Sequence, residues 1–588
     1  MFPDGVMYSH FPKNKGGENM FPDGVMYSHF PQKYRNCMRF FLLTLIFFGI
    51  INAQTWSGLR TYGGSNVDYL ERVDFYAPGN SIIFNFLLSG SYKVDNTSGS
   101  DFVVIRTNPY GSSIWERVIG VSNLNDWSYR FDYDNNGNIV IVGISCTPNA
   151  GSYIYCSNLP SSTNEGFIIK LSNNDGSVIV AKRLHDNWGD PTINNWLRVL
   201  SIETTNDGGF VIGGEIKYER YNNNVWISTT QGFVAKLDQN MNLTWIRAVG
   251  DTMDNVLAYR VINSVFQSSD GNIIAYGTSQ NNIWIGKFNI SNGNLIWQKV
   301  YNRSRNIHRL SWAKLTSDGG IIIADHIDGG VSNSDVLFLK LDQNGNLICA
   351  RQFGSLNYDF GIDVEEGSNY YYITGGLNYD NSLAYGNLFY AKINKTNCSL
   401  ITIRYLLPIS TEGRGITVKG GIAYTIGWIN NSNFSNGNWD GILAADSGIQ
   451  DTCYWRTFIP NVNQNISLSN GTNWNLYNNV LVSISNQNYN FLNVNVSKKV
   501  ACGLLTPLNN SEDYQDCEIS IINQEKFIRI VSKLNSLKVL SVYKIDGRLV
   551  YKTEFYQNNF ELKLEKGIYV LRLEYDKKTI ERKVFIRR

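Results

Sequence analysis

Short apolar stretches alternate with polar turns through residues 54–460, and the same order of segments returns several times. Each repeat has an apolar stretch, a turn with Asp-Gly or Asn-Gly, a second apolar stretch, a variable loop, and a stretch ending in a basic residue. KLDQNMNLTWIRAVG (236–250) and KLDQNGNLICARQFG (340–354) show how closely the last part recurs. Because Gly, Asn and Asp tolerate the positive φ of tight turns, such turns between apolar stretches are strong β-hairpin signals. The pattern predicts four short strands per repeat.

Repeats of roughly 50 to 70 residues that contain four strands are typical of a β-propeller. We therefore predict an all-β fold with a propeller of about seven four-stranded blades over 54–460, a count of six or eight being the alternative. Two segments compete to close the ring, TWSGLRTYGG (55–64) and CYWRTF (453–458). The repeat at 317–354 resembles those of the propellers that many secreted bacterial proteins carry, a resemblance that implies a fold and says little about the ligand.

The N-terminus carries a processing signal. MRFFLLTLIFFGIINA (38–53) has the basic residue, apolar run and small final residue of a secretory signal peptide, and it is shorter than the roughly 20 residues of a spanning helix. Upstream, MFPDGVMYSHFP occurs at both 1–12 and 20–31. We interpret 1–37 as a mis-started leader with a duplicated dodecamer, and we expect no transmembrane segment in the mature chain.

The C-terminal part differs from the repeats. Residues 461–515 are rich in Asn and Ser and are predicted to form a β linker region, whereas 516–588 is rich in Lys and Arg with regular β-alternation. The last segment resembles the C-terminal sorting domain of type IX secretion cargo, although it lacks the Pro-Asn-Pro that this family often has near its first strand. The resemblance implies an immunoglobulin-like β-sandwich, the type IX machinery as a partner, and a secreted or outer-membrane cell-surface location. The residues that carry it include Asp546, Gly547, Gly567, Tyr569 and Lys583.

Composition excludes some functions. The formal net charge is +2 and 17% of the residues are charged, which gives no reason to predict a nucleic acid partner. After residue 53 only three histidines remain, in different repeats, and no HExxH or GxSxG motif occurs. Nucleophilic catalysis therefore has no visible set of residues.

Carboxylates are the remaining catalytic candidates, because propeller glycosidases and lyases assemble them from different blades. One Asp follows the outer strand of several repeats, which places it on the way to the central tunnel. A structural role is the favoured interpretation, since such residues often accept backbone N–H bonds in turns. The four candidates are Asp68, Asp126, Asp254 and Asp359.

No cofactor is predicted, and calcium is a weak alternative. Asp132, Asp134 and Asn136 match the first half of an oxygen-ligand loop, but Gly143 stands where a closing Glu belongs. Export favours disulfides, and Cys146 and Cys156 are close enough in sequence to staple one loop.

The variable loops between the second and third strands are long, at 89–101, 145–165, 214–232, 376–387 and 428–440. Alternation of turns puts all of them on one face of the ring, where insertions often form a binding surface. We predict a protein that binds an extracellular glycan or protein there; a polysaccharide-cleaving enzyme is the second hypothesis and a structural surface-coat protein the third. The candidate binding residues are Tyr153, Tyr155, Tyr218, Tyr221, Trp226, Trp428 and Trp439.

Overall fold

The computed structural model describes most of the chain after residue 57, and every element assigned there is a β-strand. The predicted leader and signal peptide lie outside the described residues. The described residues are 58–63, 68–76, 85–92, 100–108, 111, 113–121, 123–149, 152–156, 164–186, 193–222, 225–250, 260–279, 281–303, 311–329, 334–379, 386–406, 410–430, 439–446, 448, 455–470, 475–477, 482–486, 490–492, 497–503, 519–523, 527–532, 538–544, 548–555, 559–565, 567–575 and 578–586.

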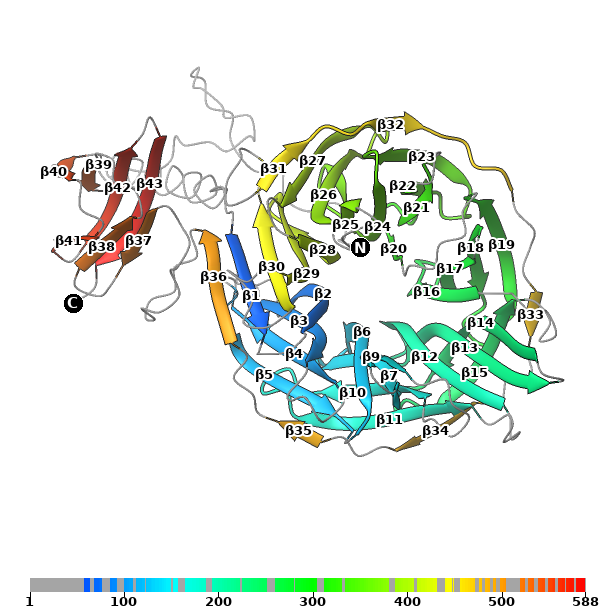
Figure 1. The fold of residues 1–588 in the computed structure, drawn as a ribbon. Coiled ribbons are helices and arrows are strands. Elements are labelled where there is room, and N and C mark those ends of the chain that lie inside the picture. Colours follow the sequence, from blue (N-terminus) through cyan, green and yellow to red (C-terminus); the bar gives the residue numbers. More distant parts are fainter. Residues whose placement is uncertain are drawn as a thin grey trace, which may run out of the picture. The chain divides into compact units, whose positions relative to one another are not determined.

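Seven antiparallel sheets form the blades of a closed propeller (Figure 1). Blades 1 to 3 are β2–β5 (Tyr69–Tyr76, Asn85–Tyr92, Asp101–Thr107, Ser113–Gly120), β6, β7, β10 and β11 (Asn125–Tyr133, Ile139–Cys146, Asn164–Leu171, Val178–Asp186), and β12–β15 (Ile193–Thr204, Phe210–Asn222, Val225–Leu237, Leu243–Gly250). Blades 4 to 6 are β16–β19 (Arg260–Gln267, Ile273–Ser279, Asn282–Phe288, Leu295–Asn302), β20–β23 (Ala313–Leu315, Ile321–Asp328, Ser334–Leu341, Leu347–Gly354), and β24–β27 (Tyr358–Glu366, Tyr370–Tyr379, Asn387–Asn394, Leu400–Leu406).

Blade 7 closes the ring with strands from both ends of the repeat region. Its first three strands are β28 (Ser410–Lys419), β29 (Ile422–Asn430) and β30 (Asp440–Asp446), and its fourth is the N-terminal β1 (Gly58–Gly63). The closing strand is thus the N-terminal of the two candidates. Closure leaves no free first or last blade.

Seven apolar clusters fill the spaces between neighbouring blades, one for each pair in the described part of the ring. Between blades 2 and 3, for example, Val140 and Leu184 pack with Leu197 and Phe210, and all four are fully buried. The alternation seen in the sequence is therefore the alternation of each sheet between its two neighbours.

In blades 2 to 5, the recurring basic residue of the third strand forms an ion pair with the Asp of the turn between the first and second strands. In blade 5 the Lys340 ammonium lies 2.7 Å from an Asp318 oxygen, which also accepts the Gly320 N–H. Corresponding pairs are Lys170–Asp134, Lys236–Asp207 and Lys287–Asp270. These pairs hold the two hairpins of a blade together.

The recurring Trp of the outer strand contacts the next blade. The Trp245 indole N–H donates to the Ile290 carbonyl at 2.7 Å. The Trp245 ring also covers Gly293, where an added Cβ would lie 2.6 Å from a carbon of that ring. Gly293 has φ of 68°. Trp115 over Gly176 and Trp297 over Gly345 repeat the contact. The Trp therefore tethers neighbouring blades.

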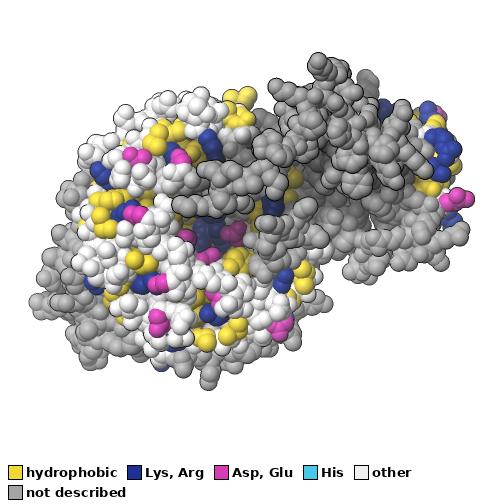
Figure 2. Space-filling view, turned by 180° about the vertical axis from the view of Figure 1, so that it is seen from behind, with side chains coloured by type: hydrophobic (Ala, Val, Ile, Leu, Met, Phe, Trp, Pro, Cys, Tyr) yellow, Lys and Arg dark blue, Asp and Glu magenta, His cyan; other side chains and the backbone are white. Residues whose placement is uncertain are grey.

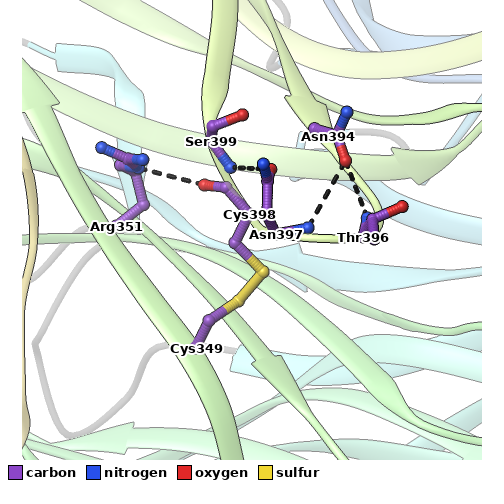
Figure 3. The surroundings of a disulfide bond; sticks show 7 residues. All are labelled: Cys349, Arg351, Asn394, Thr396, Asn397, Cys398 and Ser399. Carbon is purple, nitrogen blue, oxygen red and sulfur yellow. Dashed lines mark hydrogen bonds between the residues drawn. A yellow bond between two sulfur atoms is a disulfide. The ribbon is translucent and has the colours of Figure 1, made fainter.

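A disulfide takes the place of this contact between blades 5 and 6. Cys349 pairs with Lys340 in the ladder as Trp245 pairs with Lys236, so it occupies the Trp position. It is bonded to Cys398, whose positive φ of 55° places it at the Gly position (Figure 3). Arg351 Nε also donates to the Cys398 carbonyl at 3.0 Å.

Residues 455–503, which we call the belt, run once around the outside of the propeller (Figure 1). The belt adds antiparallel strands to the blades in the order 6, 5, 3, 2, 1 and 7, and Asn470 bridges to Tyr301 of blade 4. The region predicted as a separate linker at 461–515 thus supplies a fifth strand to most blades. The strands are β31 (Trp455–Phe458), β32 (Val462–Asn465), β33 (Asn475–Tyr477), β34 (Val482–Asn486), β35 (Asn490–Leu492) and β36 (Ser497–Gly503).

The C-terminal region forms a β-sandwich. One sheet contains β37 (Ile519–Asn523), β38 (Phe527–Ser532) and β41 (Asn559–Lys563), and the other contains β40 (Leu549–Phe555), β39 (Lys538–Lys544), β42 (Gly567–Tyr575) and β43 (Lys578–Ile586). Leu562 packs with Leu540 and Leu571 between the sheets. Tyr569 is buried, and its hydroxyl donates to the Glu565 carbonyl at 3.0 Å.

The predicted sorting residues fall on these strands or between them. Gly567 begins β42, and Lys583 lies in β43. Asp546 and Gly547 lie outside the described residues, between β39 and β40, whose ends are joined by a Lys544 N–H to Arg548 carbonyl bond of 2.8 Å.

Candidate functional site

The predicted tunnel carboxylates lie at the connections between blades. Asp68, Asp126 and Asp359 are almost fully buried, and Asp254 lies outside the described residues. Asp126 accepts the Val121 N–H at 2.8 Å, and Asp359 accepts the Ser355 hydroxyl at 2.8 Å. Each of these two carboxylates is thus bonded within its own connection.

A second carboxylate stands close to each of these. An added Cβ at Gly120 would approach Asp101 and Asp126 within 3 Å, and Gly63 and Gly354 have the same surroundings. Burial raises the pKa of Asp126 to about 7, and the charge of Asp101 adds to the rise. Such Gly positions have no room for a side chain.

The centre of the ring is filled by an ion cluster. Arg72 of blade 1 and Arg130 of blade 2 bind the Asp363 carboxylate of blade 6, at 2.9 and 3.1 Å. The Ile416 N–H of blade 7 donates to the same carboxylate, and the Arg130 guanidinium lies 3.9 Å from the Trp312 ring centroid. Burial opposes ionisation, but the two arginines outweigh it and hold the pKa of Asp363 below its usual value. The cluster joins inner strands across the axis.

An apolar cluster adjoins these charges. Trp312 packs there with Tyr129, Leu200, Phe360 and Ile362, which come from blades 2, 3 and 6. Large side chains from several inner strands thus occupy the centre of the ring, and a ligand would have to enter from one face rather than pass through.

Charged side chains also surround the axis near the tight-turn ends of the inner strands. Lys314 forms an ion pair with Glu365, and Asp132 accepts the Thr204 N–H at 2.6 Å. Burial raises the pKa of Glu203 to about 8, and the charge of Asp132 contributes to the rise. Figure 2 shows basic and acidic side chains gathered around a hollow in the middle of one face.

Of these charged residues near the axis, only Asp132 was a candidate from the sequence, and there as a calcium ligand. A signal was present, because several inner strands carry charged residues two positions apart, in RVD (72–74), RFD (130–132) and DVE (363–365). Residues two apart on a strand share one face. The sequence does not show that the first residues of these pairs, Arg72, Arg130 and Asp363, meet at the axis.

On the long-loop face, Trp428 and Trp439 pack on each other. Their ring centroids are 4.3 Å apart at 80°, and Trp428 also meets Tyr69 edge-on at 6.0 Å. Trp428 is only 8% exposed. These two rings therefore seal the junction of blades 7 and 1.

Blade 3 has a long paired extension on this face. Its β13 and β14 pair over 13 positions, whereas β21 and β22 of blade 5 pair over eight. Tyr221 is paired with Trp226, and Lys217 is paired with Trp196 of β12. Since cross-strand partners share a face, Trp196, Tyr221 and Trp226 belong to one face of this extension and Tyr218 to the other.

Blade 2 carries a small extra hairpin after β7. It consists of β8 (Pro148–Asn149) and β9 (Ser152–Cys156), and β9 contains Tyr153 and Tyr155. Cys146 is buried and disulfide-bonded. The side chains of Tyr153, Tyr155 and Cys156 lie outside the described ones.

The residues of the weak calcium loop bind protein groups. Asp134 accepts the N–H groups of Asn136 and Asn138, at 3.0 and 2.8 Å, and pairs with Lys170 at 3.1 Å. Within the described part of the chain, no group of three or more His, Cys, Asp or Glu side chains is placed to hold a metal ion.

Comparison with known proteins identifies the C-terminal region. Residues 524–587 match the model of the secretion system C-terminal sorting domain. This tail marks the chain for type IX export, to the cell surface or the medium. No curated protein matches the chain. Nor does any helix in the described residues have the length and apolarity to cross a membrane.

Solved structures with a similar fold include two propellers. The Dos1 propeller is 9% identical, with a TM-score of 0.38, over 67% of this chain and 96% of its own. The Pan2 WD40 domain of Neurospora crassa is 9% identical, with a TM-score of 0.31, over 56% of this chain and 90% of its own. Their identities are too low to suggest a ligand.

Proposed function

We propose that this exported propeller binds an extracellular glycan or protein through its long-loop face, with the extension of blade 3 as the main contact. The observation that carries the proposal is the register of that extension. Tyr221 and Trp226 are directly opposite each other, and Trp196 is opposite Lys217, four positions along β13 from Tyr221 and in register with the same face.

The residues between these aromatics are polar. Glu219 is paired with Asn194 and with Ser228, so three polar residues are in register between the two aromatic positions. Aromatic rings with polar neighbours stack on sugar rings or anchor peptide segments. The extension is also built of paired strands, which would limit the conformational entropy lost on binding.

The test is binding of the purified full chain to a glycan array and to proteins captured from the cell surface. Trp226→Ala and Tyr221→Ala should each weaken binding about tenfold or more, as expected for aromatic anchors. Tyr218→Ala is the matched control, because it lies on the same strand but on the opposite face. Equal losses in all three variants, or in none, would contradict the assignment of this face.

A second function, cleavage of a polysaccharide, is favoured by one observation near the axis, at the tight-turn ends of the inner strands. A carboxyl group that keeps its proton near neutral pH can act as general acid, and burial raises the pKa of Glu203 to about 8, with the Asp132 carboxyl close by. Its test is turnover of polysaccharides by the full chain. Glu203→Gln should abolish turnover and the exposed Asp175→Asn should leave it unchanged; absence of turnover in the wild type removes this hypothesis.

A further inference from the structure

A pocket of about 370 Å³ opens where the belt steps from blade 6 to blade 5. Its walls come from three parts of the fold. They are the connection between β23 and β24 with Leu356 and Asn357, blade 6 with Asn387 and Tyr405, and the belt with Phe458 and Asn461. The volume lies near the lower end of the roughly 300–1,000 Å³ that small-molecule sites have.

The lining is both aromatic and amide-rich, without charge. Tyr405 and Phe458 meet edge to face, with ring centroids 5.6 Å apart. All eight residues that line the pocket are uncharged, and three of them are asparagines. Leu356 and Ile459, which follows Phe458, are 72% and 85% exposed. Water around such apolar side chains is released when a ligand covers them.

The walls are held in place independently of any ligand. The Asn461 N–H donates to the Gly354 carbonyl at 2.8 Å, and the Ser355 hydroxyl is bonded to Asp359. Arg351 of blade 5 binds Asn463 of the belt at 2.9 Å. Tyr405 and Phe458 pack on the same apolar cluster as Cys349 and Cys398, which the disulfide joins. The pocket is therefore preorganised.

We propose that this pocket binds a neutral sugar residue of a glycan. An aromatic ring face stacks on the C–H face of a sugar, and side-chain amides donate to and accept from its hydroxyls. A charged sugar would enter without a counter-charge, which disfavours it. The site is separate from the extension of blade 3, since no residue is shared, and it does not depend on the function proposed there.

The experiment is titration calorimetry of the full secreted chain with oligosaccharides retained on an array of neutral and acidic glycans. Asn357→Ala and Phe458→Ala should each weaken binding of a neutral glycan about tenfold, the loss expected for one buried polar or aromatic contact. Asn344→Ala is the matched control, an exposed Asn in the β22–β23 turn outside the pocket. Asn357 is exposed, so its variant tests the pocket even if Phe458→Ala fails to fold.

The outcomes separate this pocket from the blade 3 extension. Loss of neutral-glycan binding in Asn357→Ala but not in Trp226→Ala supports the pocket. Loss in Trp226→Ala alone overturns the pocket and leaves the function proposed for blade 3. Retention of acidic glycans only, retention of a protein ligand only, or retention of no glycan by the wild type overturns the assignment of a neutral sugar.

Discussion

Single residues that recur in most repeats serve the fold more than a ligand. The basic residue near the end of the third strand, which six blades have, is an example, because Lys340 is 4% exposed at its side chain and reaches Asp318 and the Thr316 hydroxyl. The sequence shows that this Lys recurs, and it shows separately that Asp-Gly turns recur. It does not show that the two meet, because they lie 22 residues apart in blade 5.

Replacing Asp318 by Asn should destabilise the chain. The ammonium of Lys340 would keep its burial but lose its counter-charge, so we expect the free energy of unfolding in urea to fall by about 1–3 kcal/mol. Adding Lys340→Met to this variant should restore part of the loss, since it removes the buried charge. An unchanged unfolding midpoint in Asp318→Asn would show that the ion pair does not stabilise the blade.

Glu203 should make stability depend on pH. Its pKa rises from 4.5 to about 8 on folding, mainly through burial, so the folded chain keeps a proton that the unfolded chain releases. This group therefore costs nothing at pH below about 4.5, destabilises the fold increasingly up to about pH 8, and adds no further change above that.

The check is urea unfolding of the wild type and of Glu203→Gln at pH 5 and at pH 8. Gln resembles the protonated acid, so the variant should become more stable relative to the wild type at the higher pH. Stability differences that are equal at the two pH values would contradict the pKa shift.

At the scale of elements, neighbouring blades are joined at one equivalent position by different chemistry. Trp over Gly occurs at three junctions, and Cys349–Cys398 occupies the same two positions at the junction of blades 5 and 6. Cys349 and Cys398 are two of the five cysteines that the sequence left without a proposed partner, once Cys146 and Cys156 had been proposed as a pair. The equivalence becomes clear only when Cys349 is placed opposite Lys340 in the ladder.

Removing the disulfide should cost more than removing one ring contact. It closes a loop of 49 residues, for which chain entropy gives about 4 kcal/mol as an upper value. Cys349→Ser with Cys398→Ser should therefore lower the free energy of unfolding by about 2–4 kcal/mol.

The combination Cys349→Trp with Cys398→Gly should regain part of that loss, because it recreates the contact of Trp245 with Gly293. Urea unfolding of both double variants under oxidising conditions checks this. If the Trp and Gly variant is no more stable than the Ser variant, the two kinds of junction are not interchangeable.

At the scale of the whole molecule, the belt determines how the outer edges are protected. Each blade ends in a strand whose second edge would otherwise be open for pairing with another chain. The belt pairs with these edges and also covers β1, which lies between β30 and β36. The N-terminal closing strand is thus held on both sides.

A chain that ends at residue 454 lacks the belt and should therefore lose this protection. We expect faster amide hydrogen exchange in β5, β15 and β27, and larger species on size-exclusion chromatography, because those edges become free. A chain that ends at residue 503 is the matched control, since it keeps the belt and lacks only the sorting domain. Equal exchange in the two truncated chains would mean that the belt does not protect the outer strands.

The propeller, its four-stranded units and the sorting tail could all be predicted from the order of the amino acids. These follow from alternation and turn chemistry within short segments, and such signals do not depend on distant residues. The match at 524–587 confirms the tail, and the seven sheets confirm the blades. The sequence also identified both candidate closing segments.

Which segments meet could be seen only in the folded chain. Asp363 lies 291 residues from Arg72, and no local pattern links them. The belt strands are three to seven residues long and bind mainly through backbone groups, which every sequence carries. Their side chains therefore hold little information about their partners, and the belt, the filled axis and the pocket beside the belt emerge only once the ring has closed.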